Sequence, residues 1–181
     1  MHILVIQSSP HERSSSNILA ERFAQGARHV GNTVEVFDAG HARIAPCVAC
    51  DACAHGGACA IDDDMGTLRT RLLDPAVRLV AFVTPLHFSG VSSQLKIVID
   101  RLHAIEAPLR RRHLDSVLIC AAWDDNDWTM TQLTNAYGAF TRYMGMTSRG
   151  TVLGLGCGTP QDTVESAAYQ RALTLGESLR R

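Results

Sequence analysis

The chain has 181 residues, which is long enough for one domain with a sizeable core. Hydrophobic residues make up 46% of the chain and charged residues 19%, so an intrinsically disordered chain is excluded. Lys and Arg number 17 against 18 Asp and Glu, and the resulting net charge of -1 argues against a nucleic-acid-binding surface. No run of about 18 apolar residues occurs, so we expect no membrane partner.

The sequence predicts a cytoplasmic protein with reduced cysteines. The apolar run at residues 3–6 is too short for a signal peptide, so we expect a cytoplasmic protein. Because the cytosol keeps thiols reduced, the six cysteines are not expected to form a disulfide framework. Four of them lie between Cys47 and Cys59, and this clustering requires another explanation.

Five apolar segments predict β-strands that alternate with helices. The predicted strands cover residues 3–6, 33–37, 77–84, 117–122 and 151–155. The predicted helices begin after residues 14–17, 62–64, 92 and 128, and at Thr159, from which the last helix runs to the C-terminus. This alternation predicts an α/β fold with a five-stranded parallel sheet and helices on both faces, as one domain over residues 1–181.

The loop after the first predicted strand is rich in hydroxyl groups and leads directly into a helix. Its candidate ligand groups are Ser9, Ser14, Ser15, Ser16 and Asn17. Hydroxyls and free N–H groups at the positive end of a helix suit a phosphate. The loop contains no Gly and no Lys, which excludes a triphosphate-binding loop and the dinucleotide fingerprint. The pattern therefore favours a terminal monophosphate, with a turn that only caps the helix as the alternative.

The loop after the third predicted strand ends at the same edge of the sheet, where parallel α/β sheets bind ligands. It offers a rigid turn, apolar side chains and backbone groups to a flat amphipathic ring. The candidate residues are Pro85, Leu86, His87, Phe88, Ser89 and Gly90. The alternative is a turn that only packs over helix ends.

The irregular segment at about residues 44–61 carries four cysteines at short spacings. Cys47, Cys50, Cys53 and Cys59 follow the pattern C-x2-C-x2-C-x5-C. Two consecutive two-residue gaps allow three thiolates to converge on a 4Fe-4S cluster, as in ferredoxin loops, and the longer gap adds the fourth. Two alternatives remain open: a zinc site, for which His55 is a spare ligand, and plain thiols without metal. Cys120 and Cys157 are expected to be packing residues.

Three further features are assigned to structure. Gly154, Gly156 and Gly158 lack the spacing of a dinucleotide fingerprint and predict a turn between a strand and a helix. The three arginines at residues 110–112 predict a solvated loop. The acidic residues at 124–127 predict a polar connector, flanked by Trp123 and Trp128. One of these tryptophans is expected to cover a bound ligand and the other to face a subunit partner.

The quoted motifs resemble the NAD(P)H-dependent FMN reductase family, and most closely its iron-sulfur flavoprotein branch. The resemblance rests on Ser-Pro at residues 9–10, the Ser-rich loop, the cysteine spacing, the acidic run at 62–64, Thr-Pro at 84–85 and Asp-Arg at 100–101. It is strong over roughly the first 105 residues. Two departures are His11, where the family commonly has Arg, and His87, where Tyr is common.

The resemblance implies a flavodoxin-like sheet with the FMN phosphate in the first loop and the flavin ring against the Thr84 to Gly90 loop. It also implies a third cofactor contact from Ala122, Trp123 and Asp124, and a 4Fe-4S cluster on the four cysteines. Such proteins are often homodimers or homotetramers, which we expect here.

We therefore expect an FMN-dependent oxidoreductase that transfers electrons between NAD(P)H or a reduced ferredoxin-like carrier and a flavin, a quinone or another small acceptor. No catalytic side chain is required, because the cofactor carries the redox step. The alternatives are an iron-sulfur flavoprotein that serves as an electron carrier, and a non-enzymatic flavin-binding redox sensor.

Overall fold

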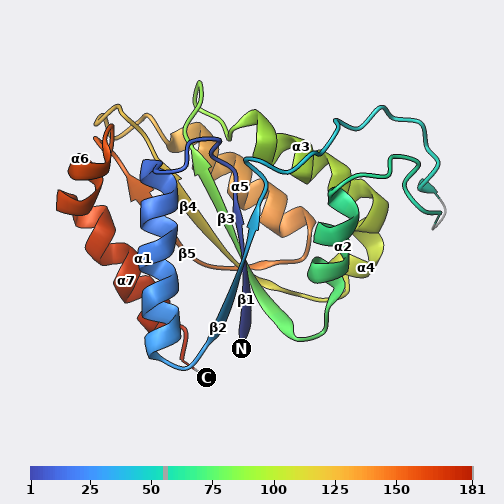
Figure 1. Ribbon diagram of the computed structural model, residues 1–181, viewed down its shortest axis with the longest axis horizontal. Helices are drawn as coiled ribbons and strands as arrows, with labels where there is room; N and C mark the ends of the chain where they lie inside the picture. The colour runs from blue at the N-terminus through green and yellow to red at the C-terminus, as the bar shows by residue number, and fades with distance from the viewer. Residues whose placement is uncertain (55–56, 181) are drawn as a thin grey trace.

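A parallel sheet of five strands forms the centre of the molecule, in the order β2-β1-β3-β4-β5 (Figure 1). The computed structural model describes residues 1–54 and 57–180. The strands are β1 (His2–Gln7), β2 (Thr33–Asp38), β3 (Val77–Pro85), β4 (Asp115–Ala121) and β5 (Thr147–Gly154). The strand order is that of flavodoxin-like folds, so the predicted fold class is confirmed.

Helices cover both faces of this sheet (Figure 1). On one face lie α1 (Ser15–His29), α6 (Pro160–Glu165) and α7 (Ala167–Ser178); on the other lie α2 (Met65–Leu73), α3 (Ser93–Arg101), α4 (Glu106–Arg110) and α5 (Thr131–Tyr143). Alternate residues of β1 divide between two cores: Ile3 and Val5 pack on the α1 side, whereas Leu4 and Ile6 face the other layer. Burial on both faces explains the unbroken apolar run of this strand.

Helices α1 and α7 cross in close backbone contact. A Cβ atom added to Gly176 would lie 2.2 Å from the carbonyl oxygen of Phe23, and one added to Gly26 would lie 2.2 Å from the carbonyl oxygen of Leu173. Glycine at both positions therefore allows the two helices to approach more closely than side chains would permit. This contact fixes α1, whose N-terminus faces the candidate site described below.

The predicted C-terminal helix is wrong in one respect, because the chain forms two helices there. α6 begins with Thr159 and Asp162 in a reciprocal capping box. Ser166 is extended (φ −75°, ψ 153°), ends α6, and accepts a hydrogen bond from the N–H of Tyr169 as the N-cap of α7. The helix predicted to begin after residue 92 ends at Arg101, where a 3-10 helix, η2 (Leu102–Ile105), follows and leads into α4.

Residues 39–64 connect β2 to α2 with little regular structure in their described part. In Figure 1 this segment extends beyond α2 and α4, at the end of the molecule opposite α6. Across the described part of the chain, no helix combines the length and the apolar character needed to span a bilayer.

Candidate functional site

The candidate site is a cavity of about 610 Å³ at the carboxyl edge of the sheet. The chain leaves β1 toward β2 on one side, and β3 lies on the other side of β1, so the strand order reverses here. Such a switch point is the usual ligand site of open parallel sheets. Eight of the predicted site residues line the cavity: Ser9, Ser14, Ser15, Ser16, Pro85, Leu86, His87 and Trp123.

The N-terminus of α1 forms one end of the cavity. Ser14 is its N-cap and accepts a hydrogen bond from the N–H of Asn17 at 3.2 Å. The hydroxyls of Ser14 and Ser16 lie 3.3 Å apart, and Ser9 accepts a hydrogen bond from the N–H of His11. No acidic residue occupies the first turn of α1, so the positive end of the helix dipole is available to an anion. These groups fit the phosphate of FMN in number and chemistry.

The loop after β3 forms the middle of the cavity wall and is held by buried hydrogen bonds. The hydroxyl of Thr84 accepts from the N–H of Ser92 at 2.9 Å, and the hydroxyl of Ser92 donates to that of Ser8 at 2.8 Å. The N–H of Leu86 donates to the carbonyl of Ala121 at 2.8 Å. Sequence reasoning missed Ser8 and Ser92 as supports for this loop. A polar residue directly after a buried strand, as Ser8 is after β1, is a signal of such a role, whereas Ser92 is the N-cap of α3.

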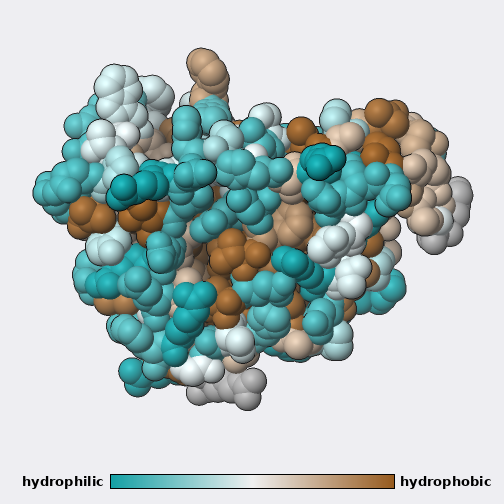
Figure 2. All heavy atoms as spheres, viewed as in Figure 1, coloured by the Kyte–Doolittle hydropathy of each residue, from teal (hydrophilic) through white to brown (hydrophobic). Residues whose placement is uncertain are grey.

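Phe88, Ser89 and Gly90, three residues predicted to line the site, lie outside the cavity wall. His87 and Gly90 exchange two backbone hydrogen bonds and close a hairpin, with Phe88 and Ser89 in the left-handed region at its tip (φ 48° and 63°). Phe88 is fully exposed. The hairpin projects from the molecule in Figure 1, and Figure 2 shows its tip as a hydrophobic projection.

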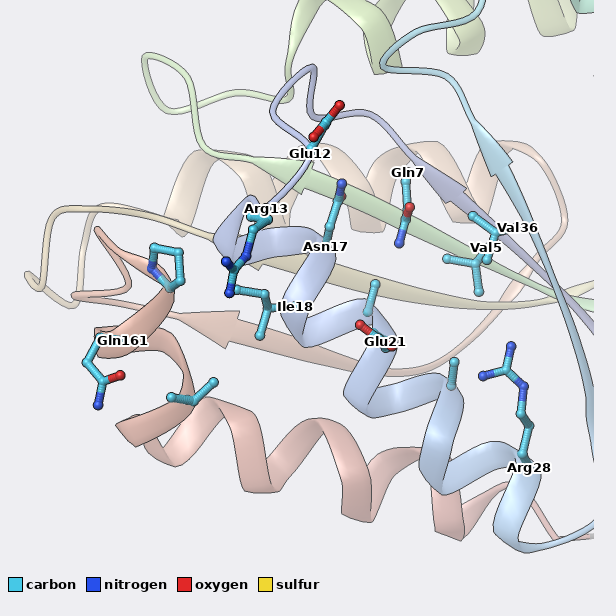
Figure 3. A pocket seen from close by; sticks show the side chains of 14 residues that line it. Val5, Gln7, Glu12, Arg13, Asn17, Ile18, Glu21, Arg28, Val36 and Gln161 are labelled. Carbon is cyan, nitrogen blue, oxygen red and sulfur yellow. The ribbon is translucent and has the colours of Figure 1, made fainter.

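Asn17, Ala122 and Asp124 also do not line the cavity. Asn17 instead faces an adjoining hollow of about 640 Å³ beside α1, where Arg13 and Gln7 project as well (Figure 3). Ala122 is buried; its N–H donates to the carbonyl of Gly154 at the end of β5, and its carbonyl accepts from the N–H of Cys157 in the following loop. The carboxylate of Asp124 accepts hydrogen bonds from the backbone and the side chain of Asn126, and these bonds lower the pKa of Asp124. Asp124 thus lies in a polar connector, as the sequence predicted.

The loop after β5 completes the cavity wall. Cys157, Gly158 and Pro160 line it, although the sequence analysis did not assign them to a site. The three glycines at 154, 156 and 158 form the end of β5 and the turn toward α6, as predicted. Cys120 and Cys157 are buried, and burial raises the pKa of Cys120 well above its usual value.

The four clustered cysteines are all free thiols: Cys47 and Cys50 are exposed, and Cys53 and Cys59 are half-buried. His55 lies outside the described residues. Within residues 1–54 and 57–180, no three Cys, His, Asp or Glu side chains come together in a group suited to a metal ion. The four thiols match a 4Fe-4S cluster in chemistry, but among the described residues they do not form a group that could hold a metal ion.

Arg101 binds residues at both ends of the cysteine segment (residues 44–61). The sequence analysis did not predict this role. The side chain of Arg101 is 1% exposed and pairs with the carboxylate of Asp63 at 2.8 and 3.1 Å. It also donates to the carbonyls of Ala45 (2.6 Å) and Ile61 (3.3 Å) and to the sulfur of Cys59 (3.5 Å). Arg101 therefore joins both ends of the segment to the end of α3.

Two pKa values reflect this arrangement. Partial burial opposes the ionisation of Asp63, but hydrogen bonds from Arg101 and from backbone N–H groups lower its pKa below the usual value. Partial burial likewise opposes ionisation of Cys59, and the N–H of Ile61 together with the charge of Arg101 lowers the pKa of this thiol.

The predicted solvated arginine loop needs a correction at Arg112. This side chain is half-buried and donates to the carbonyls of Leu72, Asp74 and Val77, so it holds the turn between α2 and β3. Arg110 pairs with Glu106 on the surface of α4.

The fold and the cavity at the switch point define a flavodoxin-like α/β protein. A family model described as NADPH-dependent FMN reductase matches residues 1–153, so the chain belongs to that family. This confirms the family expected from the sequence motifs.

Individual relatives agree with this family. The chain is 32% identical over 105 residues to an iron-sulfur flavoprotein of Archaeoglobus fulgidus, which covers 58% of this chain and 52% of that protein. The chain thus spans about half the length of this curated relative.

Two solved structures share the fold over the whole chain. An NAD(P)H:quinone oxidoreductase from Methanothermobacter marburgensis superposes with a TM-score of 0.78 at 20% identity, covering 100% of this chain and 96% of that one. An FMN-dependent NADH-azoreductase from Bacillus anthracis, solved with FMN, superposes with a TM-score of 0.71 at 15% identity. The superposition covers 100% of this chain and 100% of that one.

Proposed function

We propose that the protein is an FMN-dependent oxidoreductase that transfers electrons between NAD(P)H or a reduced ferredoxin-like carrier and a flavin, quinone or other small acceptor. The observation that carries this proposal is the hydroxyl-lined N-terminus of α1, which has no acidic residue in its first turn and opens into a cavity of about 610 Å³ at the switch point of the sheet. Membership in the NADPH-dependent FMN reductase family supports the choice of FMN.

In this proposal the chain binds and orients the cofactor. Ser9, Ser14, Ser15 and Ser16 hold the phosphate with hydroxyls and with N–H groups of the first turn. Leu86 and His87 bound the ring, and the Thr84–Ser92 hydrogen bond keeps their loop fixed. Bound FMN supplies hydride and single-electron chemistry, so no side chain needs to act as acid or base.

Turnover by the FMN-loaded protein tests this function. NADH or NADPH oxidation is followed at saturating menadione and, separately, with free FMN as acceptor. We expect oxidation well above the rate of free FMN alone. If FMN is bound but neither nicotinamide is oxidised above background, the reductase proposal fails, and the redox-sensor alternative gains support.

A second candidate function is that of an electron carrier with a 4Fe-4S cluster. The cysteine spacing and the similarity to the Archaeoglobus fulgidus iron-sulfur flavoprotein favour it. The thiols of Cys47, Cys50, Cys53 and Cys59 would then have to gather around the cluster, because they are not grouped in the structure. Iron, sulfide and zinc analysis of protein purified without oxygen distinguishes a cluster, with about four iron atoms per chain, from zinc and from plain thiols.

We further propose that the protein forms a homodimer or homotetramer in the cytoplasm. An apolar hollow of about 410 Å³ between α3 and α5, lined by Leu95, Ile99 and Phe140 among others, supports association with a second copy. The six free cysteines favour a compartment where thiols stay reduced. Light scattering of the purified protein tests the oligomeric state; a monomer at micromolar concentration would contradict this proposal.

A further inference from the structure

The turn after β2 lies directly against the backbone of Ser9, in the loop that carries the candidate phosphate groups. A Cβ atom added to Gly40 would lie 2.2 Å from the carbonyl oxygen of Ser9 and 2.7 Å from its carbonyl carbon. Gly40 does not have a positive φ, so glycine is required here by the close contact and not by the backbone conformation. A side chain at position 40 would therefore displace the backbone of Ser9.

Hydrogen bonds hold this turn in place. The N–H groups of Ala39 and Gly40 both donate to the carbonyl of Gln7, at 2.7 and 3.1 Å, directly after the last paired residues of β1 and β2. The carboxylate of Asp38 accepts from the N–H of His41 at 3.3 Å, and its Oδ2 lies 2.8 Å from the imidazole Nδ1 of His41. The turn is thus closed by its own side chains and joined to the end of β1.

The other side of the same loop is held by β3. The N–H of Ser8 donates to a carbonyl of β3 at 3.1 Å. Ser9 is 1% exposed and lines the cavity, where its hydroxyl accepts from the N–H of His11 at 3.3 Å. The start of the loop therefore lies between β3 and the turn after β2, and Gly40 determines how closely that turn approaches Ser9.

We propose that Gly40, in the turn closed by Asp38 and His41, is a positioning residue for the phosphate of FMN. It sets the place of Ser9, and through Ser9 the preference of the site for a phosphorylated flavin. None of residues 38–41 lines the cavity, so the turn acts only through the loop after β1. This inference rests on the proposed function, because it assumes that Ser9 contacts the phosphate.

The physical basis is the geometry of hydrogen bonds to a charged group. Such bonds are short and weaken steeply when the donor and acceptor are misaligned. A displaced Ser9 would therefore bind the phosphate of FMN more weakly, whereas riboflavin, which has no phosphate, would be almost unaffected.

Asp38 distinguishes positioning from a purely electrostatic effect. Its carboxylate is an anion close to the loop, so by charge alone its removal would strengthen the binding of an anionic phosphate. If Asp38 acts by closing the turn, its removal weakens FMN binding instead. The two explanations predict opposite changes for D38A.

The test measures the dissociation constants of FMN and riboflavin by flavin fluorescence for the wild type, G40A, D38A and D38N. The ratio of the two constants reports on phosphate recognition, which a general loss of stability would not change selectively. G138A is the matched control for a glycine-to-alanine change, because a Cβ atom at Gly138 would meet no atom within 4 Å.

We expect G40A to weaken FMN binding about tenfold, as for the loss of one hydrogen bond to a charged group, and riboflavin binding by less than about twofold. D38A should also weaken FMN binding relative to riboflavin. D38N should bind FMN at least as tightly as the wild type, since it keeps an acceptor for His41 and loses the negative charge. G138A should match the wild type.

Two results would overturn the inference: a ratio of dissociation constants that is unchanged in G40A, or FMN binding that is tighter in D38A. If G40A does not fold, D38A and D38N decide the question, because the side chain of Asp38 is 51% exposed. A wild-type protein that binds both flavins equally would overturn the phosphate assignment and this inference together. Failure of the proposed function is a distinct result, in which the FMN-loaded wild type oxidises neither NADH nor NADPH while the ratios still follow the expected order.

Discussion

Replacing Arg101 with Met removes the cation that closes the cysteine segment. Methionine keeps the apolar stem but leaves the carboxylate of Asp63, which is 11% exposed, without its ion-pair partner. The carbonyls of Ala45 and Ile61 also lose a donor. Removing one member of a buried ion pair typically costs about 3–5 kcal/mol, because the remaining charge is uncompensated. We expect R101M to lose this amount of unfolding free energy, which corresponds to roughly 6–20 °C in Tm for a chain of this size.

The pH dependence provides a second measure of the same pair. The pKa of Asp63 is lowered in the folded protein, so the pair stabilises the fold above the unfolded-state pKa of about 3.9. This stabilisation is lost as the pH falls through the lower, folded-state pKa. The difference in unfolding free energy between wild type and R101M should therefore narrow below about pH 4.

Urea unfolding followed by circular dichroism measures both effects. R112M is the matched control, because Arg112 also donates to three carbonyls but has no ion-pair partner among the hydrogen bonds it makes. R112M should lose less unfolding free energy, about 1–3 kcal/mol. The rate at which Cys59 is alkylated should change in R101M but not in R112M. A loss below about 1 kcal/mol in R101M, with no pH dependence, would refute the reasoning.

Three further predictions follow from other contacts. G176A should destabilise the protein by about 1–3 kcal/mol in the same unfolding assay, because its methyl group would meet the carbonyl oxygen of Phe23; an unchanged midpoint would contradict the close crossing of α1 and α7. S14A should cost about 1 kcal/mol as a lost N-cap, and the double variant S14A/S16A should weaken FMN binding in a fluorescence titration. FMN affinity unchanged in that double variant would mean that the phosphate binds elsewhere. Y137F should cost roughly 1 kcal/mol, since it leaves the buried hydroxyl of Ser116 without this partner.

The sheet was predictable from the sequence because its strands are buried on both faces. The apolar run in β1 and the longer run in β3 predict strands without help from tertiary contacts, and the alternation with helices determines the parallel arrangement. Helix boundaries were less predictable. Ser166 ends α6 and begins α7 through cap bonds, and the sequence pattern alone does not distinguish such a break from a continuous helix.

The site was predictable where a residue's position follows from the end of a strand. Ser9, Ser14 and Leu86 line the cavity because the loops after β1 and β3 meet at one edge of the sheet. Side-chain direction near those loops was not predictable: Asn17 is the third residue of α1 and faces the neighbouring hollow. Phe88 lines no part of the cavity because a two-residue turn places it at the tip of a hairpin.

Long-range partners were the least predictable part. Arg101 and Asp63 are 38 residues apart, and nothing in the local pattern of either indicates that they pair. The same holds for Gly40 and Ser9, which come from the loops after neighbouring strands. Both pairs depend on how the completed sheet brings distant loops together.

The most direct test of the central claim compares the binding of FMN and riboflavin to the purified protein. Riboflavin carries the same ring but lacks the phosphate, so the comparison isolates the contribution of the α1 N-terminus and its hydroxyls. We predict that FMN binds and that riboflavin binds at least about tenfold more weakly, since hydrogen bonds to a charged group contribute about 1.5–3 kcal/mol. Equal affinity for the two flavins, or no binding of FMN, would contradict the account.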